Sequence, residues 1–295
     1  PMLYPGLYEQ VINNALNREL AEIPEARKST APIDTAEAAK VLAQYLTDVV
    51  QKGLENVQDN GGGIEAQIQL ANQIVATIQN TTQEANFAAL GVDQRAEQLL
   101  ALLQQNDPRL ATGKSAKDLD RPETSIAQSS LFTGAIHEPQ MYTELKKEIV
   151  SADRIDMLVS FIKWSGLRLI MGELRQFVQS GGELRIITTS YMGATDVKAI
   201  EELRALPNTK IKVSYDTKRT RLHAKTYVFY RDTGFTTAYV GSSNLSNAAI
   251  SSGLEWNVKV TRKDLPESIE KIAATFERYW NSSEFEYYDE GQLER

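Results

Sequence analysis

Cysteine is absent from this sequence of 295 residues, and histidine occurs only twice, at His137 and His223. Without cysteine, the chain can form no disulfide, no cysteine-ligated zinc site and no thiol nucleophile. Two histidines are too few for a histidine-rich metal site, so we expect neither a metal nor another cofactor. The sequence also has no apolar run of membrane-spanning length and no secretory signal before its first predicted helix. These absences favour a cytoplasmic protein that does not enter a membrane.

The excess of negative charge is small and unevenly distributed. The formal net charge is −7, from 32 basic and 39 acidic residues. Residues 1–122 hold most of that excess, with sixteen acidic and ten basic residues, and the remainder is almost balanced. A negative total argues only weakly against nucleic-acid binding, because the local distribution of charge matters more. The length exceeds one typical domain, so we expect two.

Residues 1–122 have the periodicity of helices and carry no recognisable chemistry. Apolar residues at helical spacing predict helices through 7–20, 41–54, 64–78 and 96–103. The pattern Asp34-Thr35-Ala36-Glu37 has the form of a capping box at the start of the second helix, and Gly61-Gly62-Gly63 ends it. No Lys-Ser or Lys-Thr follows these glycines, so a linker is a better interpretation than a phosphate loop. We interpret residues 1–122 as a helical docking region.

The pattern of predicted secondary structure changes after a polar connector at 107–130. Helices and strands then alternate, with helices predicted at 142–150, 167–178, 196–206 and 267–280, and strands at 154–162, 183–188, 210–214 and around His223, Tyr239 and Trp256. This order predicts an α/β domain with a mostly parallel mixed sheet flanked by helices. We place this domain at 123–285. We expect residues 286–295 to be an acidic tail leading into a further C-terminal part.

Two neighbouring predicted strands carry polar residues that are unusual in a core. His223 and Lys225 lie in the apolar stretch Leu222–Tyr230, two positions apart, so a strand would project both from one face. The next strand ends in Gly241-Ser242-Ser243-Asn244, where backbone N–H groups and an amide can approach an anion. An imidazole, an ammonium and an amide at strand ends predict a phosphate site that contains a nucleophile.

This H-x-K pattern followed by G-S-x-N resembles the signature of the phospholipase D superfamily of phosphodiesterases and nucleases. In that family the His attacks phosphorus, and the Lys and Asn hold the non-bridging oxygens. The resemblance therefore implies catalytic roles for His223, Lys225 and Asn244, with Ser242 assisting. It also implies a metal-independent mechanism with a phosphohistidine intermediate and a phospholipase D-like fold.

A glutamate downstream of the signature often orients the His in this family. Glu255 lies thirteen residues after Ser242, a spacing similar to that of the nuclease members. One position departs from the family pattern: Tyr230 stands where an Asp is expected, five residues after Lys225, and Asp232 is out of phase. That Asp is usually taken as structural in the family.

Basic residues gather just before the H-x-K pattern. Lys218, Arg219 and Arg221 are predicted to clamp the phosphate backbone of a nucleic acid, rather than to form an ordinary solvated loop. Gly241 and Ser243 complete the predicted substrate-binding set. The resemblance is strongest to nuclease-like members found at the N-terminus of bacterial helicase-type proteins. It implies DNA as the substrate and a helicase-type domain, in a DNA-processing or defence protein, beyond these 295 residues.

The family normally uses two H-K-N sets, and this sequence contains one. His137 has no Lys two residues later and no G-S-x-N after it, so a loop or cap role fits it better. The missing set would come from a second copy, which predicts a homodimer with a composite active site. A non-catalytic nucleic-acid-binding module that retains the phosphate pocket is an alternative, to which Tyr230 points. A phospholipase is disfavoured, because lipid-acting members usually carry both sets in one chain.

Overall fold

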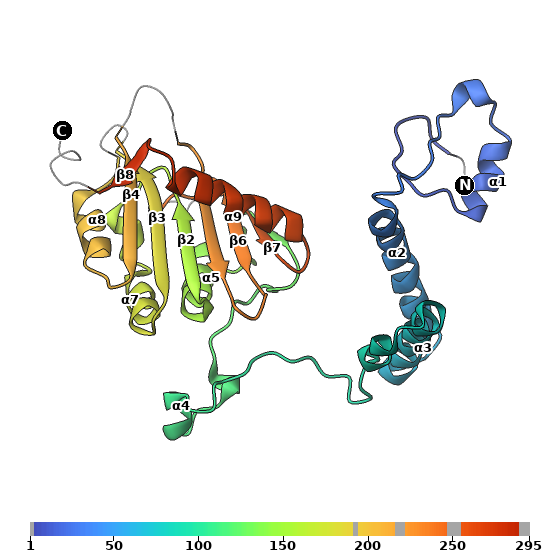
Figure 1. The fold of residues 1–295 in the computed structure, drawn as a ribbon, viewed down its shortest axis with the longest axis horizontal. Coiled ribbons are helices and arrows are strands. Elements are labelled where there is room, and N and C mark those ends of the chain that lie inside the picture. The colour runs from blue at the N-terminus through green and yellow to red at the C-terminus, as the bar shows by residue number, and fades with distance from the viewer. Residues whose placement is uncertain (1–2, 191–193, 216–221, 247–254, 289–295) are drawn as a thin grey trace. The chain divides into compact units, whose positions relative to one another are not determined.

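The computed structural model describes residues 3–190, 194–215, 222–246 and 255–288. The chain divides into two compact units, Pro1–Leu100 and Ala101–Arg295 (Figure 1). The predicted domain boundary at residue 122 therefore lies within the second unit. Among the helices of the described ranges, none is long and apolar enough to cross a membrane.

The first unit consists of helices without a sheet in its described part. Its helices are α1 (Asn14–Ala21), η1 (Glu25–Arg27), α2 (Ala38–Asp59), α3 (Ile64–Thr82) and η2 (Ala85–Leu90). Helices α2 and α3 form a hairpin across the predicted glycine break, and the Gln67 side chain donates to the carbonyl of Leu54 at 3.1 Å. The side chain of Asn13 caps α1 by accepting from the backbone N–H of Leu16.

Three predictions for this unit are wrong in detail, the first being the helix predicted through 7–20, which begins only at Asn14. Helix α2 begins at Ala38 without a side-chain cap, because the Asp34 carboxylate accepts from Ala36 within the turn before it. The helix predicted through 96–103 does not form: Ala96 has φ +54°, a left-handed conformation that interrupts a helix. Leu99 is 76% exposed, so its apolar spacing has nothing to pack against.

The second unit begins with the connector, which contains the short helices α4 (Pro108–Ala111) and η3 (Ala116–Asp118). Its strands are β1 (Ser130–Phe132), β2 (Arg154–Leu158), β3 (Glu183–Thr189), β4 (Thr209–Ser214), β5 (Thr226–Tyr230), β6 (Thr237–Gly241), β7 (Asn257–Thr261) and β8 (Phe285–Tyr287). Its longer helices are α5 (Met141–Ser151), α6 (Trp164–Leu167), α7 (Met171–Gln179), α8 (Val197–Arg204) and α9 (Pro266–Trp280). The predicted α/β class is confirmed, and so is the helical region before it.

The strands form one mixed sheet in the order β1-β7-β6-β5-β2-β3-β4-β8. Only β2-β3 and β3-β4 pair in parallel, and the other five pairs are antiparallel. This corrects the prediction of a mostly parallel sheet. The strands from β5 to β7 follow one another without an intervening helix in the described residues, and neighbouring strands joined in this way pair antiparallel. Strand β8 includes residues 286 and 287, which the sequence had assigned to the tail.

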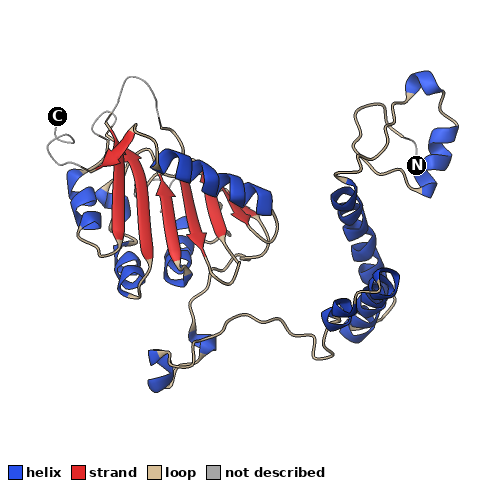
Figure 2. Ribbon diagram, in the orientation of Figure 1, coloured by secondary structure: helices blue, strands red, loops and turns tan. Residues whose placement is uncertain are grey.

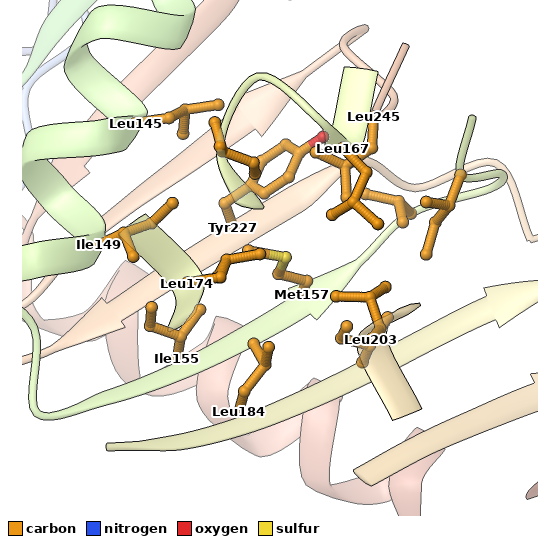
Figure 3. Close-up of a cluster of buried hydrophobic side chains, with 14 of the residues drawn as sticks. Leu145, Ile149, Ile155, Met157, Leu167, Leu174, Leu184, Leu203, Tyr227 and Leu245 are labelled. Carbon is orange, nitrogen blue, oxygen red and sulfur yellow. The ribbon is translucent and has the colours of Figure 1, made fainter. Parts of the chain in front are cut away.

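Helices cover both faces of the sheet (Figures 1 and 2). The larger core lies under α5, α6, α7 and α8, and includes Leu145, Ile155, Leu174 and Leu203, all at most 1% exposed. Tyr227 and Leu245 lie in the same core, so the two segments that carry the motif are fixed to it (Figure 3). Helix α9 packs on the opposite face.

Buried charges link α5, the sheet and the connector. The Glu148 carboxylate is fully buried and lies 3.0 Å from Lys259 Nζ and 3.2 Å from Arg231 Nη2. Lys259 also donates to Thr124 Oγ1 at 2.9 Å. The buried Glu144 carboxylate accepts from the backbone N–H groups of the connector residues 123 and 124. Each buried charge is therefore compensated, as burial without water requires.

Candidate active site

The H-x-K segment lies just before β5 rather than within it. Strand pairing ends where Thr226 meets Leu158, the last residue of β2, so His223 and Lys225 fall outside the ladder. This corrects the prediction that both residues lie on a strand. The His223 side chain is exposed, whereas Lys225 is only 6% exposed. The segment thus presents an accessible imidazole beside a buried ammonium.

His223 and Lys225 are in direct contact. Lys225 Nζ lies 2.7 Å from His223 Nδ1 and donates to the His223 carbonyl oxygen at 3.1 Å. Burial lowers the pKa of Lys225, and the nearby negative charge of Glu255 opposes that shift. A charged ammonium can only donate, so whenever Lys225 is charged, His223 Nδ1 is the acceptor in this contact.

The Gly241–Asn244 segment is joined to the H-x-K segment through the backbone. The N–H of Gly241 donates to the Lys225 carbonyl at 3.2 Å. A Cβ at Gly241 would lie 2.1 Å from the Trp256 carbonyl oxygen and 2.6 Å from Asn257 Oδ1. No larger residue fits without separating the strands, so the structure explains Gly241 by the close approach of β6 and β7.

Ser242 and Glu255 form the second polar pair of the site. The Ser242 hydroxyl donates to the Glu255 carboxylate, the Ser242 N–H donates to the Trp256 carbonyl, and the Trp256 N–H donates to Ser242 Oγ. Glu255 therefore lies at the site, where the sequence spacing predicted it. Its hydrogen bond in this structure goes to Ser242, whereas the resemblance assigned it to the ring of His223.

Buried side chains hold the middle of the G-S-S-N segment. The hydroxyl of Tyr227 donates to the Ser243 carbonyl at 2.8 Å, and Asn257 Nδ2 donates to Ser243 Oγ at 2.8 Å. Burial, followed by the charge of Glu255, raises the pKa of Tyr227, so this hydroxyl stays protonated. Asn244 is 6% exposed, and its Oδ1 accepts from the Phe161 N–H at 3.2 Å. The amide nitrogen of Asn244 is then the group that can donate to an anion.

Tyr230 lies at the far end of β5 from His223. Its ring stacks on the Arg154 guanidinium, 4.1 Å from the ring centroid. Burial, together with the charge of Asp156, raises the pKa of Tyr230 to about 12. The position that departs from the family pattern therefore supports the strand and does not contact the H-x-K segment.

The predicted basic clamp, Lys218, Arg219 and Arg221, lies outside the described residues. His137 lies in an exposed turn before α5, as expected. Sequence reasoning missed Tyr227, Asn257 and Phe161, which hold Ser243 and Asn244 in place. A buried tyrosine hydroxyl needs an acceptor, which was the one signal available for Tyr227. The other two depend on strand pairing that no local pattern reveals.

Comparisons with known proteins give one family match and several similar solved structures. Residues 145–280 match the family model described as "Cardiolipin synthase, PLD-like domain". Two similar solved structures are NucT from Helicobacter pylori, with 21% identity and a TM-score of 0.41 over 51% of this chain and 94% of that one, and Nuc from Salmonella typhimurium, described as a phospholipase D family member, with 22% identity and a TM-score of 0.42 over 55% and 99%. No curated protein matches the sequence. The matched stretch 145–280 spans a little under half of this chain and includes His223, Lys225 and Asn244, so this part of the chain is similar to phospholipase D-like domains.

Proposed function

We propose that this domain is a metal-independent phosphodiesterase that cleaves DNA through a phosphohistidine at His223. The observation that carries the proposal is the contact between the exposed His223 ring and the buried Lys225 ammonium, with Ser242 and Glu255 beside them. A nucleophile, a fixed cation and a carboxylate are the groups that phosphoryl transfer needs when no metal neutralises the phosphate.

An arriving phosphodiester competes with His223 for Lys225. In the proposed mechanism a non-bridging oxygen takes over the Lys225 ammonium, and the amide nitrogen of Asn244 donates to the same phosphate. The N–H of the released His223 ring then donates to the Glu255 carboxylate, and Glu255 gives up its hydrogen bond from Ser242. That exchange fixes the tautomer in which the other ring nitrogen has a free lone pair.

The reaction then proceeds in two balanced steps. In the first, the His223 nitrogen forms a bond to phosphorus, the P–O bond to the leaving group breaks, and His223 of a second subunit gives its proton to the leaving oxygen. In the second, water attacks phosphorus, that second imidazole accepts the proton, and the P–N bond breaks. In-line displacement puts the two imidazoles on opposite sides of phosphorus, so one ring cannot serve both roles in one step. We therefore propose a homodimer with a shared site, and, from the family resemblance, a helicase-type domain further along the natural chain.

The test is cleavage of plasmid and oligonucleotide DNA in excess chelator. We expect His223→Ala to lower the rate by at least about a hundredfold. His137→Ala is the matched control, since it removes the other, exposed histidine, and its rate should equal that of the wild type. Activity that disappears with chelator and returns with magnesium would rule out this mechanism. Mixing wild-type chains with an excess of His223→Ala chains should reduce activity more than dilution does.

A nucleic-acid-binding module without catalysis is the second candidate. It is favoured by the same contacts, because Lys225 holds His223 and Ser242 holds Glu255 in this structure. Binding of oligonucleotide with no cleavage under any condition, and weaker binding by Lys225→Ala, would establish this candidate. Lipid diesters remain disfavoured by the single motif set.

A further inference from the structure

The first unit buries almost none of its apolar residues. Among the described residues 3–100, Ile68 is the only one that is buried, and neither α1 nor α2 has any buried residue. Helices of this kind gain most of their stability from packing an apolar face rather than from intrinsic propensity. A helical unit without a core of its own therefore needs a surface to cover its apolar faces.

Three of the exposed apolar residues of this unit form a stripe on α2. Leu42, Leu46 and Val49 are 43%, 53% and 46% exposed. Their spacing of four and three residues puts them on one side of the helix, in the pattern of a helix–helix seam. Ile78 of α3 is also exposed, at 42%.

Contacts within the hairpin show where this stripe lies. Near the turn the two helices pack together, since Gln67 bonds to the Leu54 carbonyl and the Leu70 side chain covers Gly53. In an antiparallel hairpin the residues before position 50 of α2 lie beside the second half of α3. The stripe and Ile78 therefore share the open end of the hairpin, away from the turn, and we call Leu42, Leu46, Val49 and Ile78 the open-end surface.

The composition of α3 also favours burial. Glu65 is the only charged residue among its nineteen, and the polar positions are amides and threonines. A helix whose outer side faces water usually carries charged residues on that side. Amide side chains without net charge are compatible with a helix that lies inside a bundle.

We propose that the open-end surface is a dimerisation surface that packs against the same surface of a second copy, so that two hairpins form a four-helix bundle. The proposal rests on the proposed function for the identity of the partner, because the catalytic site there requires a second His223. A two-fold contact is self-complementary, so an uncharged apolar stripe can meet its own copy without like-charge repulsion. The bundle geometry follows from the seam spacing on α2.

The test compares two full-length variants that add the same charge to the same helix. Leu46→Glu places a carboxylate within the stripe, and Gln44→Glu places one at an exposed polar position of α2. We expect the dimer dissociation constant, measured by analytical ultracentrifugation, to rise at least about a hundredfold for Leu46→Glu and to change little for Gln44→Glu. Cleavage by Leu46→Glu should be lost at low concentration and recover at concentrations above its dissociation constant. Circular dichroism should show equal helix content in both variants.

Two variants with opposite charges at one position distinguish a loss of dimerisation from a folding defect. Leu46→Glu and Leu46→Lys chains should each dimerise weakly alone and associate tightly when mixed, which a misfolded hairpin could not do. A dissociation constant for Leu46→Glu within threefold of the wild type would overturn the proposal. So would a monomeric wild type in which Leu46→Glu increases proteolysis, since the surface would then be covered by the rest of the same chain. Failure of the catalytic proposal is recognised separately, because an inactive wild type would still lose its dimer through Leu46→Glu.

Discussion

The two units of this chain differ in what they bury. In the second unit, a continuous apolar core extends from Phe132 to Leu245, and even Glu148 and Lys259 are fully enclosed with partners. In the first unit, α2 has 22 residues and none of them is buried, and Leu42, Leu46 and Val49 on one side of it are 43–53% exposed. A core with compensated charges can be stable alone, whereas a hairpin with an open surface depends on what covers it. Under our proposal, the second unit is stable through its own core and the first unit mediates assembly.

The difference between the two units is tested most directly by a substitution at Glu148. Replacing it with Ala leaves Lys259 and Arg231 buried without their anion, and we expect a loss of about 3–5 kcal/mol in the free energy of unfolding. All three tryptophans, at 164, 256 and 280, lie in the second unit, so tryptophan fluorescence during urea unfolding reports that unit alone. Glu270→Ala, at an exposed position of α9 in the same unit, is the control and should change stability by at most about 0.5 kcal/mol. Equal effects of the two changes would contradict the distinction.

Acid should weaken the second unit through the same carboxylate. Burial by itself would raise the pKa of Glu148, but the charges of Arg231 and Lys259 outweigh it and hold the pKa below its usual 4.5. A carboxylate with a lowered pKa in the folded state contributes stability above its unfolded pKa, and that contribution is lost as the pH falls through the folded pKa. The difference between the urea midpoints of the wild type and Glu148→Gln should therefore be largest at pH 6 and should decrease below about pH 4.5. A difference that is constant down to pH 3 would contradict this assignment.

The smallest effect is expected at Tyr230. Tyr230→Phe keeps the ring on Arg154 and removes only the hydroxyl, so the free energy of unfolding should fall by less than about 1 kcal/mol. The DNA cleavage rate should equal that of the wild type, because Tyr230 lies at the opposite end of β5 from His223. Tyr230→Ala, which also removes the ring, should cost more stability and still leave the rate per folded molecule unchanged. Loss of cleavage in Tyr230→Phe would show that the position matters for chemistry.

Sequence periodicity was informative where a segment has a core to face. The helix predicted at 142–150 and the strands at 183–188 and 210–214 agree with α5, β3 and β4, because their apolar residues face a shared core. The helix predicted through 96–103 failed for the opposite reason: its leucines face no core. The parallel share of the sheet was overestimated because the order of strands in space depends on connections that local patterns do not encode.

The sequence pattern predicts which residues form the candidate site, but it does not predict the contacts that hold them in place. The spacing of the motif located His223, Lys225, Ser242 and Glu255, since those residues follow one another along the chain in a recognisable pattern. The strand boundary before Thr226 was not predictable, because it is set by where β2 ends. The bond from Tyr227 to Ser243 likewise arises only when β5 and β6 are aligned.

The hydrogen bonds of the connector determine how far the chain can be shortened from its N-terminal side without disturbing the second unit. Thr124 receives the Lys259 ammonium, and its backbone N–H, like that of residue 123, is bound by Glu144. A shortened chain that started at residue 131 would keep every central strand, but the buried Lys259 would lose its bond to Thr124 and the buried Glu144 would lose its donors from residues 123 and 124. A fragment that starts upstream of residue 122 keeps both, so the domain as a folding object begins well before its first strand. Any transfer of this domain into another protein would have to include that segment.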